Sequence, residues 1–250
     1  MLAVERRKLI LNLLKIEGRV MAVELSQKLG TCEDTIRRDL REMAADGLLQ
    51  RVHGGALPHS PAETSFSYRQ QQISPGKKEI AQKAARFVQS GMVVFLSGGT
   101  TNVELASALP RDLPVTIITH NPAVAVALAD HTLAEVVLIG GRLFKRTMVT
   151  VGSETVEALR GMRADLCMLG VCSLHPEAGI SMPDLEESYV QQMMINNAAE
   201  TIALVSQEKL GTVSHFTVAG IQDVNMIVTE QLTPQALLEP YRTLGIEILQ

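Results

Sequence analysis

The C-terminal three quarters of the chain alternate short apolar runs with segments of helical character, and this alternation limits the possible folds more than any other feature. Strand-like runs cover residues 92–96, 115–119, 135–140, 166–171, 201–206 and 225–229, and helical stretches lie near 102–109, 121–130, 153–162 and 185–199. Because apolar strands that alternate with helices form parallel sheets covered on both faces, we expect an α/β body over residues 77–250.

The first 57 residues have a different pattern, of short helices separated by glycines. Leucine and isoleucine recur at helical spacing before Gly18, a second helix is predicted from Ala22 to Gly30, and a third begins near Glu33. Two short helices joined by a tight turn that contains glycine are typical of a helix-turn-helix. We therefore expect a small DNA-binding domain at residues 1–57.

The third predicted helix has one apolar and one basic face. Ile36, Leu40 and Met43 share a face that we expect to pack on the first two helices. The opposite face carries Asp34 and three arginines, namely Arg37, Arg38 and Arg41. A guanidinium can bind phosphate or read a guanine edge, so these arginines are candidate DNA contacts. The alternative is a solvated helix face with i,i+4 ion pairs.

Residues 48–57, LLQRVHGGAL, predict a small β-hairpin, or wing, after the third helix. Arg51 and His53 are expected to lie along the phosphate backbone, with Thr35 of the helix as a further contact. His53 could also be a simple turn or surface residue. No metal site is predicted there, because no partner His or Cys stands at zinc spacing.

Residues 58–76 separate the two patterns. They contain Pro58, Pro61 and Pro75 and show no sustained period, so we expect a linker or arm that is at most partly ordered. Charge also divides here. Residues 1–58 carry ten Lys and Arg against eight Asp and Glu, for a net charge of +2, and the remainder carries 13 against 19, for −6. A basic N-terminal domain on an acidic body is compatible with nucleic-acid binding by that domain alone.

Several classes of protein are not expected. No apolar run approaches the roughly 18 residues of a membrane span, and the start MLAVERRKLI has charges where a signal peptide has its apolar stretch. The three cysteines form no CxxC pair, which favours a reducing compartment. A cytoplasmic protein with no membrane partner is expected.

A glycine loop follows the first strand of the predicted body. Small residues and hydroxyls at a helix start present backbone amides to an anion. Polar residues after other strands converge on the same edge, and a lysine further on could pair with phosphate. Candidate effector-binding residues are Ser97, Gly98, Gly99, Thr100, Thr101, Asn121, Gly141, Glu187 and Lys209. The loop has neither the Walker nor the GxGxxG spacing, so no cofactor is predicted. The alternative is a tight strand-to-helix turn without a ligand.

Taken in order, ERRKLILNLL at 5–14, GRVMAVELSQKLG at 18–30, TIRRDL at 35–40 and GLLQRVHGGA at 47–56 resemble the head of DeoR-family bacterial repressors. The body also resembles the effector domain of that family through its GGTT loop, THN segment, GG pair at 140–141, Asp165 and KLG at 209–211. The resemblance implies a winged helix-turn-helix with its third helix in the major groove. It also implies a body related in fold to ribose-5-phosphate isomerase that binds phosphorylated sugars.

The chain departs from the family pattern at a few polar positions. Cys32 stands where the family usually has a serine as N-cap of the recognition helix, and Thr31 could substitute for it. In the body, four residues differ from the usual acidic or basic ones, namely Ser97, Gln191, Ser206 and Glu230. These departures leave open a body that binds no sugar phosphate.

The expected function is a sequence-specific transcriptional regulator, with repression expected first and activation left open. It would bind double-stranded operator DNA as a dimer or tetramer and respond to a small phosphorylated sugar. A second reading keeps the DNA-binding domain but makes the body only an oligomerisation scaffold. A remote third reading is a sugar-phosphate isomerase, for which Glu187 is the one plausible base, so an enzyme is not expected.

Overall fold

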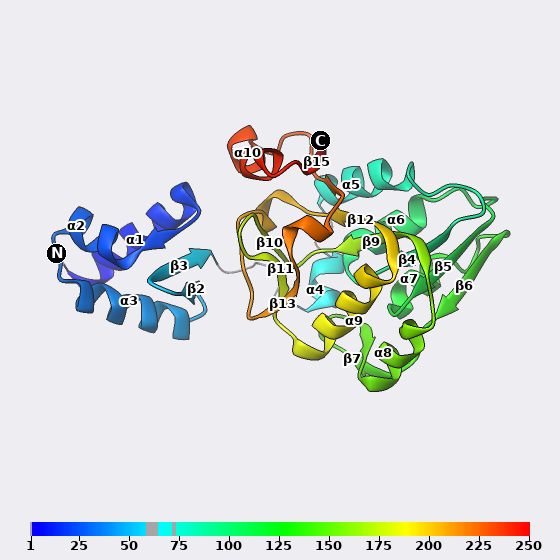
Figure 1. Ribbon diagram of the computed structural model, residues 1–250, viewed down its shortest axis with the longest axis horizontal. Helices are drawn as coiled ribbons and strands as arrows, with labels where there is room; N and C mark the ends of the chain where they lie inside the picture. Colours follow the sequence, from blue (N-terminus) through cyan, green and yellow to red (C-terminus); the bar gives the residue numbers. More distant parts are fainter. Residues whose placement is uncertain (1, 59–64, 72–73) are drawn as a thin grey trace.

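The computed structural model describes residues 2–58, 65–71 and 74–250 of the chain. Figure 1 shows a small N-terminal domain at one end of the molecule and a larger α/β body at the other. The body contains a parallel sheet with helices on both faces, and the N-terminal domain is helical with a small sheet. The predicted fold class is therefore confirmed.

The N-terminal domain consists of three helices and a three-stranded antiparallel sheet. Its elements are α1 (Ala3–Glu17), β1 (Val20–Met21), α2 (Ala22–Leu29), α3 (Glu33–Ala45), β2 (Leu49–Val52) and β3 (Gly55–Pro58). The strand order is β1-β3-β2, and the β2–β3 hairpin turns at His53 and Gly54. Ile36, Leu40 and Met43 of α3 are buried in one apolar cluster with side chains of α1 and α2, as their spacing predicts.

One glycine of the wing is required by the close approach of two strands. Val20 belongs to β1, the strand that pairs with β3. A Cβ added to Gly55 of β3 would lie 2.0 Å from the backbone oxygen of Val20. Any side chain at this position would push β3 of the wing away from β1.

The connecting segment contains a short helix that its sequence did not predict. Within residues 58–76 the chain forms α4 (Phe66–Gln71), and α5 (Pro75–Ala85) begins before the predicted boundary. Phe66 is buried in one of the body's two apolar clusters. The rest of the predicted linker, residues 59–64 and 72–73, lies outside the described residues.

The body is built on a seven-stranded sheet with the order β15-β14-β12-β9-β4-β5-β6, in which every neighbouring pair is parallel. The strands are β4 (Val93–Leu96), β5 (Val115–Thr119), β6 (Ala134–Leu138), β9 (Ala164–Gly170), β12 (Ala198–Leu204), β14 (Met226–Val228) and β15 (Glu247–Leu249). The first six match the predicted runs. β15 was not predicted from the sequence, because three residues are too few to show a period.

Helices cover both faces of this sheet. The remaining body helices are α6 (Thr100–Ala108), α7 (Pro122–Ala127), α8 (Ser153–Arg160), α9 (Leu185–Asn196) and α10 (Gln235–Thr243). Side chains of α5, α6 and α7 pack in one apolar cluster, and side chains of α8, α9 and α10 pack in the other. Along β9, Leu166 and Met168 belong to the first cluster and Cys167 and Leu169 to the second, as the alternation of a strand requires.

Short antiparallel strands at the edge of the body were not predicted. A hairpin is formed by β7 (Arg142–Phe144) and β8 (Val149–Val151). A three-stranded sheet is formed by β10 (Ser173–His175), β11 (Gly179–Met182) and β13 (Phe216–Ala219). None of the helices in the described part of the chain is long and apolar enough to cross a lipid bilayer.

The order of the strands marks one end of the sheet as a place for a ligand. From β4 the sheet grows through β5 to β6, and the chain then resumes on the other side of β4 with β9 and β12. The switch point therefore lies between β4 and β9. Ligands of open parallel sheets bind outside the carboxyl ends of the strands at such a point.

Candidate nucleic-acid interface and ligand site

The exposed face of α3 carries the predicted arginines. The side chains of Arg37 and Arg38 are 56% and 77% exposed. Arg37 pairs with Glu33 at 2.6 Å and Arg38 with Glu42 at 2.9 Å, while exposed Arg41 makes no ion pair within the described residues. The i,i+4 pairs of the alternative reading are thus present. Since exposed pairs contribute less than about 1 kcal/mol each, these arginines remain available to phosphate.

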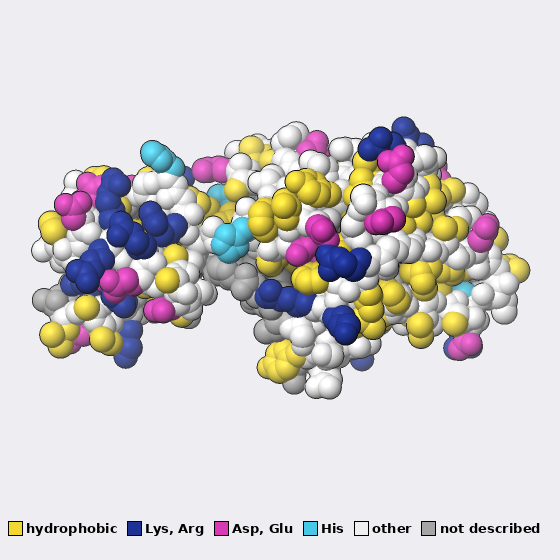
Figure 2. All heavy atoms as spheres, turned by 90° about the horizontal axis from the view of Figure 1, so that it is seen from below, with side chains coloured by type: hydrophobic (Ala, Val, Ile, Leu, Met, Phe, Trp, Pro, Cys, Tyr) yellow, Lys and Arg dark blue, Asp and Glu magenta, His cyan; other side chains and the backbone are white. Residues whose placement is uncertain are grey.

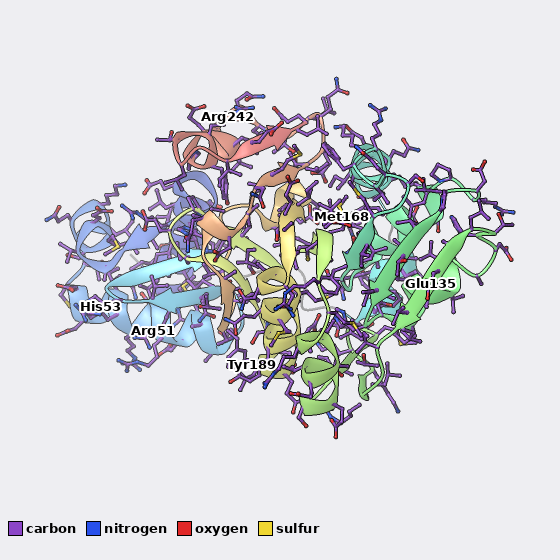
Figure 3. The ribbon with its side chains drawn as sticks, turned by 45° about the vertical axis from the view of Figure 1, so that its right-hand side comes forward. Arg51, His53, Glu135, Met168, Tyr189 and Arg242 are labelled. Atoms are coloured by element: carbon purple, nitrogen blue, oxygen red, sulfur yellow. The ribbon has the colours of Figure 1, made fainter. Side chains whose placement is uncertain are left out.

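The wing lies beside this face. Arg51 and His53 are both exposed, and Figure 3 shows them on the hairpin, away from the body. Arg37 of α3 and Arg51 of the wing line the same small hollow. Lys and Arg side chains gather on the face of the N-terminal domain seen in Figure 2. The helix and the wing therefore present one continuous basic surface.

A buried ion-pair cluster holds α1 against α3, and sequence reasoning did not single it out. Asp39 is only 3% exposed. It accepts hydrogen bonds from Nε of Arg6 at 2.5 Å and Nε of Arg7 at 3.1 Å, and Arg7 also pairs with Glu42. Arg6 and Arg7 thus have a structural role, because removing one partner of a buried pair leaves an uncompensated charge.

The start of α3 has no side-chain cap. Cys32 is the N-cap residue but accepts no hydrogen bond from the backbone of the first turn. Its Sγ lies 3.0 Å from Oγ1 of Thr35, and this contact lowers the pKa of the thiol. Thr31 does not take over the capping role: Cys32 is the N-cap residue, and the Thr31 hydroxyl donates to the carbonyl oxygen of Leu29 at 3.3 Å.

In the body, the predicted glycine loop lies at the carboxyl end of β4, at the switch point. Ser97 is buried, and its Oγ accepts from the amide of Gly170 at 2.8 Å and from Nδ2 of Asn102 at 3.2 Å. Ser97 therefore joins β4 to β9. Gly99 is the N-cap of α6, and buried Thr100 and Thr101 form its first turn.

The structure brings two predicted residues, Asn121 and Glu187, close to a third, Gly98. A Cβ added to Gly98 would lie 3.6 Å from Nδ2 of Asn121 and 3.8 Å from Oε1 of Glu187, and only 2.6 Å from Cγ1 of Val149. Asn121 caps α7 through its Oδ1, which accepts from the amide of Ala123 at 2.8 Å. Its Nδ2 is left to face this space.

Several buried polar atoms near this edge have no hydrogen-bond partner among the described residues. They are Nδ2 of Asn121, Oδ1 of Asn102, Oε1 of Gln191 and both ring nitrogens of His120. Buried polar groups in proteins are nearly always paired, so such a group of atoms is typical of a site that bonds a polar ligand or water. His120 and Gln191 were not among the predicted site residues, although His120 directly follows a predicted strand.

Glu187 and Lys209 are both buried. Burial, and to a smaller extent the charge of Glu187, raises the pKa of the nearby Cys172 thiol to about 11, against the charge of Lys209, which lowers it. Burial raises the pKa of Glu187 to about 7, against the positive charges of Arg69 and Arg146. Burial also lowers the pKa of Lys209, whose Nζ donates to the carbonyl oxygen of Val171 at 2.6 Å. Lys209 lies in the short helix η2 (Gln207–Lys209) after β12.

A small, partly open cavity of about 40 Å³ adjoins this group. Its lining comes from the β7–β8 loop, the segment after β9 and the start of α9, namely Phe144, Arg146, Thr147, Cys172, Pro183, Asp184 and Glu187. The cavity holds about two or three water molecules. A larger ligand would extend out of this cavity or displace part of its lining.

Two other residues lie apart from this cluster. A Cβ on predicted Gly141 would meet Oγ1 of Thr155 and the backbone oxygen of Val151, so the structure does not join Gly141 to Glu187. Asp165 is near the amino end of β9, where it accepts from the amide of Val93 at 2.8 Å. It therefore lies at the opposite end of the sheet from the ligand site.

Comparison with known proteins agrees with both halves of this architecture. A family model described as the DeoR-like helix-turn-helix domain matches residues 6–61, and one described as the DeoR C terminal sensor domain matches residues 73–231. The HTH-type transcriptional regulator GlpR of Haloferax volcanii is 31% identical over 100% of this chain and 98% of its own length. The glycerol-3-phosphate regulon repressor of Escherichia coli K12 is 29% identical over 94% of each chain.

A solved structure of D-ribose-5-phosphate isomerase in complex with phospho-erythronic acid is 16% identical over 53% of this chain and 52% of its own, with a TM-score of 0.39. The family models together span most of the sequence, and the curated relatives align along nearly all of it. The chain belongs to the DeoR family of transcriptional regulators.

Proposed function

We propose that this chain binds an operator in double-stranded DNA through α3 and the wing, and that a small phosphorylated metabolite bound to the body controls that binding, with repression as the expected output. The observation that carries the proposal is the continuous basic surface on which Arg37 of α3 and Arg51 of the wing line one hollow. An α-helix fits the major groove, where arginine can read guanine, and a wing can follow the adjacent phosphates.

The roles of individual residues follow from their positions. Arg37, Arg38 and Arg41 project from the exposed face of α3, and Thr35 lies on its first turn. These four are assigned to the groove. Arg51 and His53 of the wing are assigned to the phosphate backbone.

The test uses an operator selected by the wild-type protein from random-sequence DNA. Arg37→Ala or Arg38→Ala should weaken binding by about 5- to 150-fold, which corresponds to about 1–3 kcal/mol for a bidentate base contact. Arg111→Ala, on the exposed surface of the body, is the matched control and should bind as the wild type does. Unchanged operator affinity in both α3 variants would contradict the proposal that α3 contacts the bases of the operator.

The ligand half of the proposal is supported by the cluster at the carboxyl ends of β4 and β9. A glycine loop at a helix start, unpaired polar atoms and buried Lys209 can together bind an anionic group and sugar hydroxyls. A relative named as a glycerol-3-phosphate regulon repressor makes a phosphorylated compound of this size a reasonable ligand class.

A thermal-shift panel tests this half. The panel contains glycerol 3-phosphate, fructose 1-phosphate, fructose 6-phosphate, glucose 6-phosphate and inorganic phosphate, each sugar beside its unphosphorylated form. A ligand that binds only the folded state raises the melting temperature with dose, so a phosphorylated compound should do so where its counterpart does not. The same compound should change operator affinity, because control requires different affinities for the two states.

The alternative hypothesis, in which the body only holds an oligomer together, is favoured by one observation, the small size of the cavity. It predicts no response to any member of the panel together with normal operator binding. Under either reading we propose a homodimer or tetramer, since two-fold operators bind symmetric oligomers. Sedimentation of the full-length protein measures this state, and a monomer at operator-saturating concentration would contradict it.

A further inference from the structure

The helix that leads from the DNA-binding domain into the body is attached to the ligand site. Phe66 at the start of α4 is 5% exposed and belongs to the apolar cluster that also contains Leu96 of β4 and Val103 of α6. Its backbone amide donates to the carbonyl oxygen of Arg146 at 2.7 Å. Arg146 lies in the β7–β8 loop and lines the small cavity beside Glu187. The connecting helix is therefore bonded to a loop that lines the site.

Arg69 follows Phe66 by three residues, so both side chains lie on the same side of α4. Nε of Arg69 is buried and has no hydrogen-bond partner among the described residues. A guanidinium nitrogen in this state retains an unused donor, and buried donors are rarely left unpaired. The position of Arg69 thus combines a fixed backbone with a free hydrogen-bonding group.

The surroundings of Arg69 are rich in positive charge. Four charged groups lie close enough to shift the pKa of the Cys172 thiol. They are one carboxyl, Glu187, and three cations, namely Lys209, Arg69 and Arg146. Burial raises the pKa of the Glu187 carboxyl to about 7, so its negative charge is incomplete at neutral pH. Burial lowers the pKa of Lys77 in α5, and the positive charge of Arg69 lowers it further, whereas the acids Glu208 and Glu230 raise it. Asp184 also lines the cavity and raises the pKa of Glu187 further, so the three cations stand against two acids, and this positive balance suits an anion.

We propose that Arg69 of the connecting helix is a ligand-binding residue, and that its guanidinium pairs with the phosphate group of the metabolite held at the carboxyl ends of β4 and β9. This inference rests on the ligand half of the proposed function. It identifies which part of the metabolite the connecting segment contacts.

The chemistry fits the residue type. The planar guanidinium donates two parallel hydrogen bonds to phosphate oxygens, which an ammonium group cannot do with the same geometry. Nδ2 of Asn121 and the carboxyl of Glu187 face the space beside Gly98, where they suit hydroxyl groups. The phosphate would then lie toward α4 and the hydroxyls toward the sheet.

The size of the cavity adds a mechanical consequence. A sugar phosphate is several times larger than the two or three waters that about 40 Å³ can hold, so its binding would displace part of the cavity lining, to which the β7–β8 loop contributes Arg146 and Thr147. Because the amide of Phe66 is hydrogen-bonded to that loop, a displacement of the loop by the ligand would be passed to α4. The ligand would then alter the path of the segment that positions the DNA-binding domain.

The test measures binding of the same panel, inorganic phosphate included, by calorimetry to the wild type, Arg69→Gln and Arg69→Lys. The control is Arg86→Gln, an exposed arginine just after α5. Arg69→Gln should raise the Kd of the phosphorylated compound at least tenfold and leave the Kd of its unphosphorylated form unchanged. Arg69→Lys should lie between, because it keeps the charge and loses the bidentate geometry.

A purely structural role for Arg69 would lower the melting temperature without ligand and would not change the preference for phosphate. Operator affinity without ligand should stay that of the wild type, while the compound concentration that alters it should rise in parallel with Kd. Equal affinity of wild type and Arg69→Gln for the phosphorylated compound would overturn the inference and leave the proposed function intact. If no phosphorylated compound or inorganic phosphate binds the wild type, the ligand half of the proposed function fails, and this inference fails with it.

Discussion

At the scale of single residues, two buried titratable groups near the carboxyl edge of the sheet have pKa shifts in opposite directions. Burial raises the pKa of Glu187 to about 7 and lowers the pKa of His120 to about 4. Both groups thus favour their neutral form in the folded state. Between about pH 4.5 and 6.5 ionised Glu187 reduces stability as the pH rises, whereas His120 reduces it as the pH falls, so the two dependences oppose each other.

Replacing Glu187 should separate its pH dependence of stability from that of His120. The folded protein binds the Glu187 proton more tightly than the unfolded chain does, so wild-type stability from this group falls as the pH rises from about 4.5 to about 7. In Glu187→Gln that loss disappears. The variant should therefore gain free energy of unfolding over the wild type in this range, up to about 3 kcal/mol above pH 7.

Urea denaturation at pH steps from 4.5 to 8 measures the difference. The three tyrosines, Tyr68, Tyr189 and Tyr241, all lie outside the N-terminal domain, so their fluorescence reports on the body. Glu200→Gln, at an exposed carboxyl, is the control. A difference between wild type and Glu187→Gln that stays constant with pH would contradict the burial argument.

Sequence patterns predicted some of these residues and could not predict others. The exposure of Arg37, Arg38 and Arg41 follows from the phase of α3, because the apolar residues fix which face is buried. Asp39 lies in the same helix, yet its burial depends on two arginines more than thirty residues earlier. Such long-range pairing leaves no periodic signal.

At the scale of elements, α3 begins without a side-chain cap. The structure gives Cys32 backbone angles suited to an N-cap, and Thr31 is bonded elsewhere. Cys32→Ser should place a hydroxyl acceptor where the amides of the first turn can donate to it. We expect a gain of about 0.5–1 kcal/mol in the stability of that turn.

Hydrogen exchange of the amides at the start of α3 measures this gain in the full-length protein. Cys32→Ser should slow their exchange by about two- to fivefold. Cys32→Ala removes the sulfur without adding an acceptor and should not slow exchange. Equal protection in the serine and alanine variants would show that the cap is not formed.

Some helices and strands could be predicted from the sequence and others could not. The six strands of the parallel sheet that were predicted are apolar on both faces and bounded by turns, so composition marks them clearly. The β7–β8 hairpin, the β10-β11-β13 sheet and α4 were missed. Each is too short to show a period, and each is held by contacts with distant parts of the chain, as Phe66 is by the core.

At the scale of the whole molecule, charge is divided between the two domains. The first 58 residues have a net charge of +2 and the rest −6. The body as a whole therefore repels DNA, and attraction depends on the basic surface of α3 and the wing. Arg19 at the edge of the N-terminal domain meets Glu177 of the body at 3.2 Å, an exposed pair that contributes little to holding the domains together.

This division predicts the response to salt. Operator affinity should fall steeply and linearly on a double-logarithmic plot against salt concentration, because each phosphate contact releases counterions. Arg51→Ala should reduce the magnitude of the slope by about 0.9 if Arg51 contacts one phosphate. Titrations between about 50 and 200 mM salt measure the slope, with Arg160→Ala on α8 as the control. An identical slope in wild type and Arg51→Ala would exclude the wing arginine from the backbone contacts.

The burial of Phe66 also bears on how family members can recombine. A natural or engineered chimera that joins a foreign DNA-binding domain to this body would, by sequence boundaries alone, be cut at the start of the α/β pattern near Lys77. That cut would discard Phe66 from the core and the hydrogen bond to Arg146. The unit that must stay intact in such a chimera therefore begins before Ser65. A DNA-binding domain can be exchanged without damage to the body only when the junction lies upstream of α4.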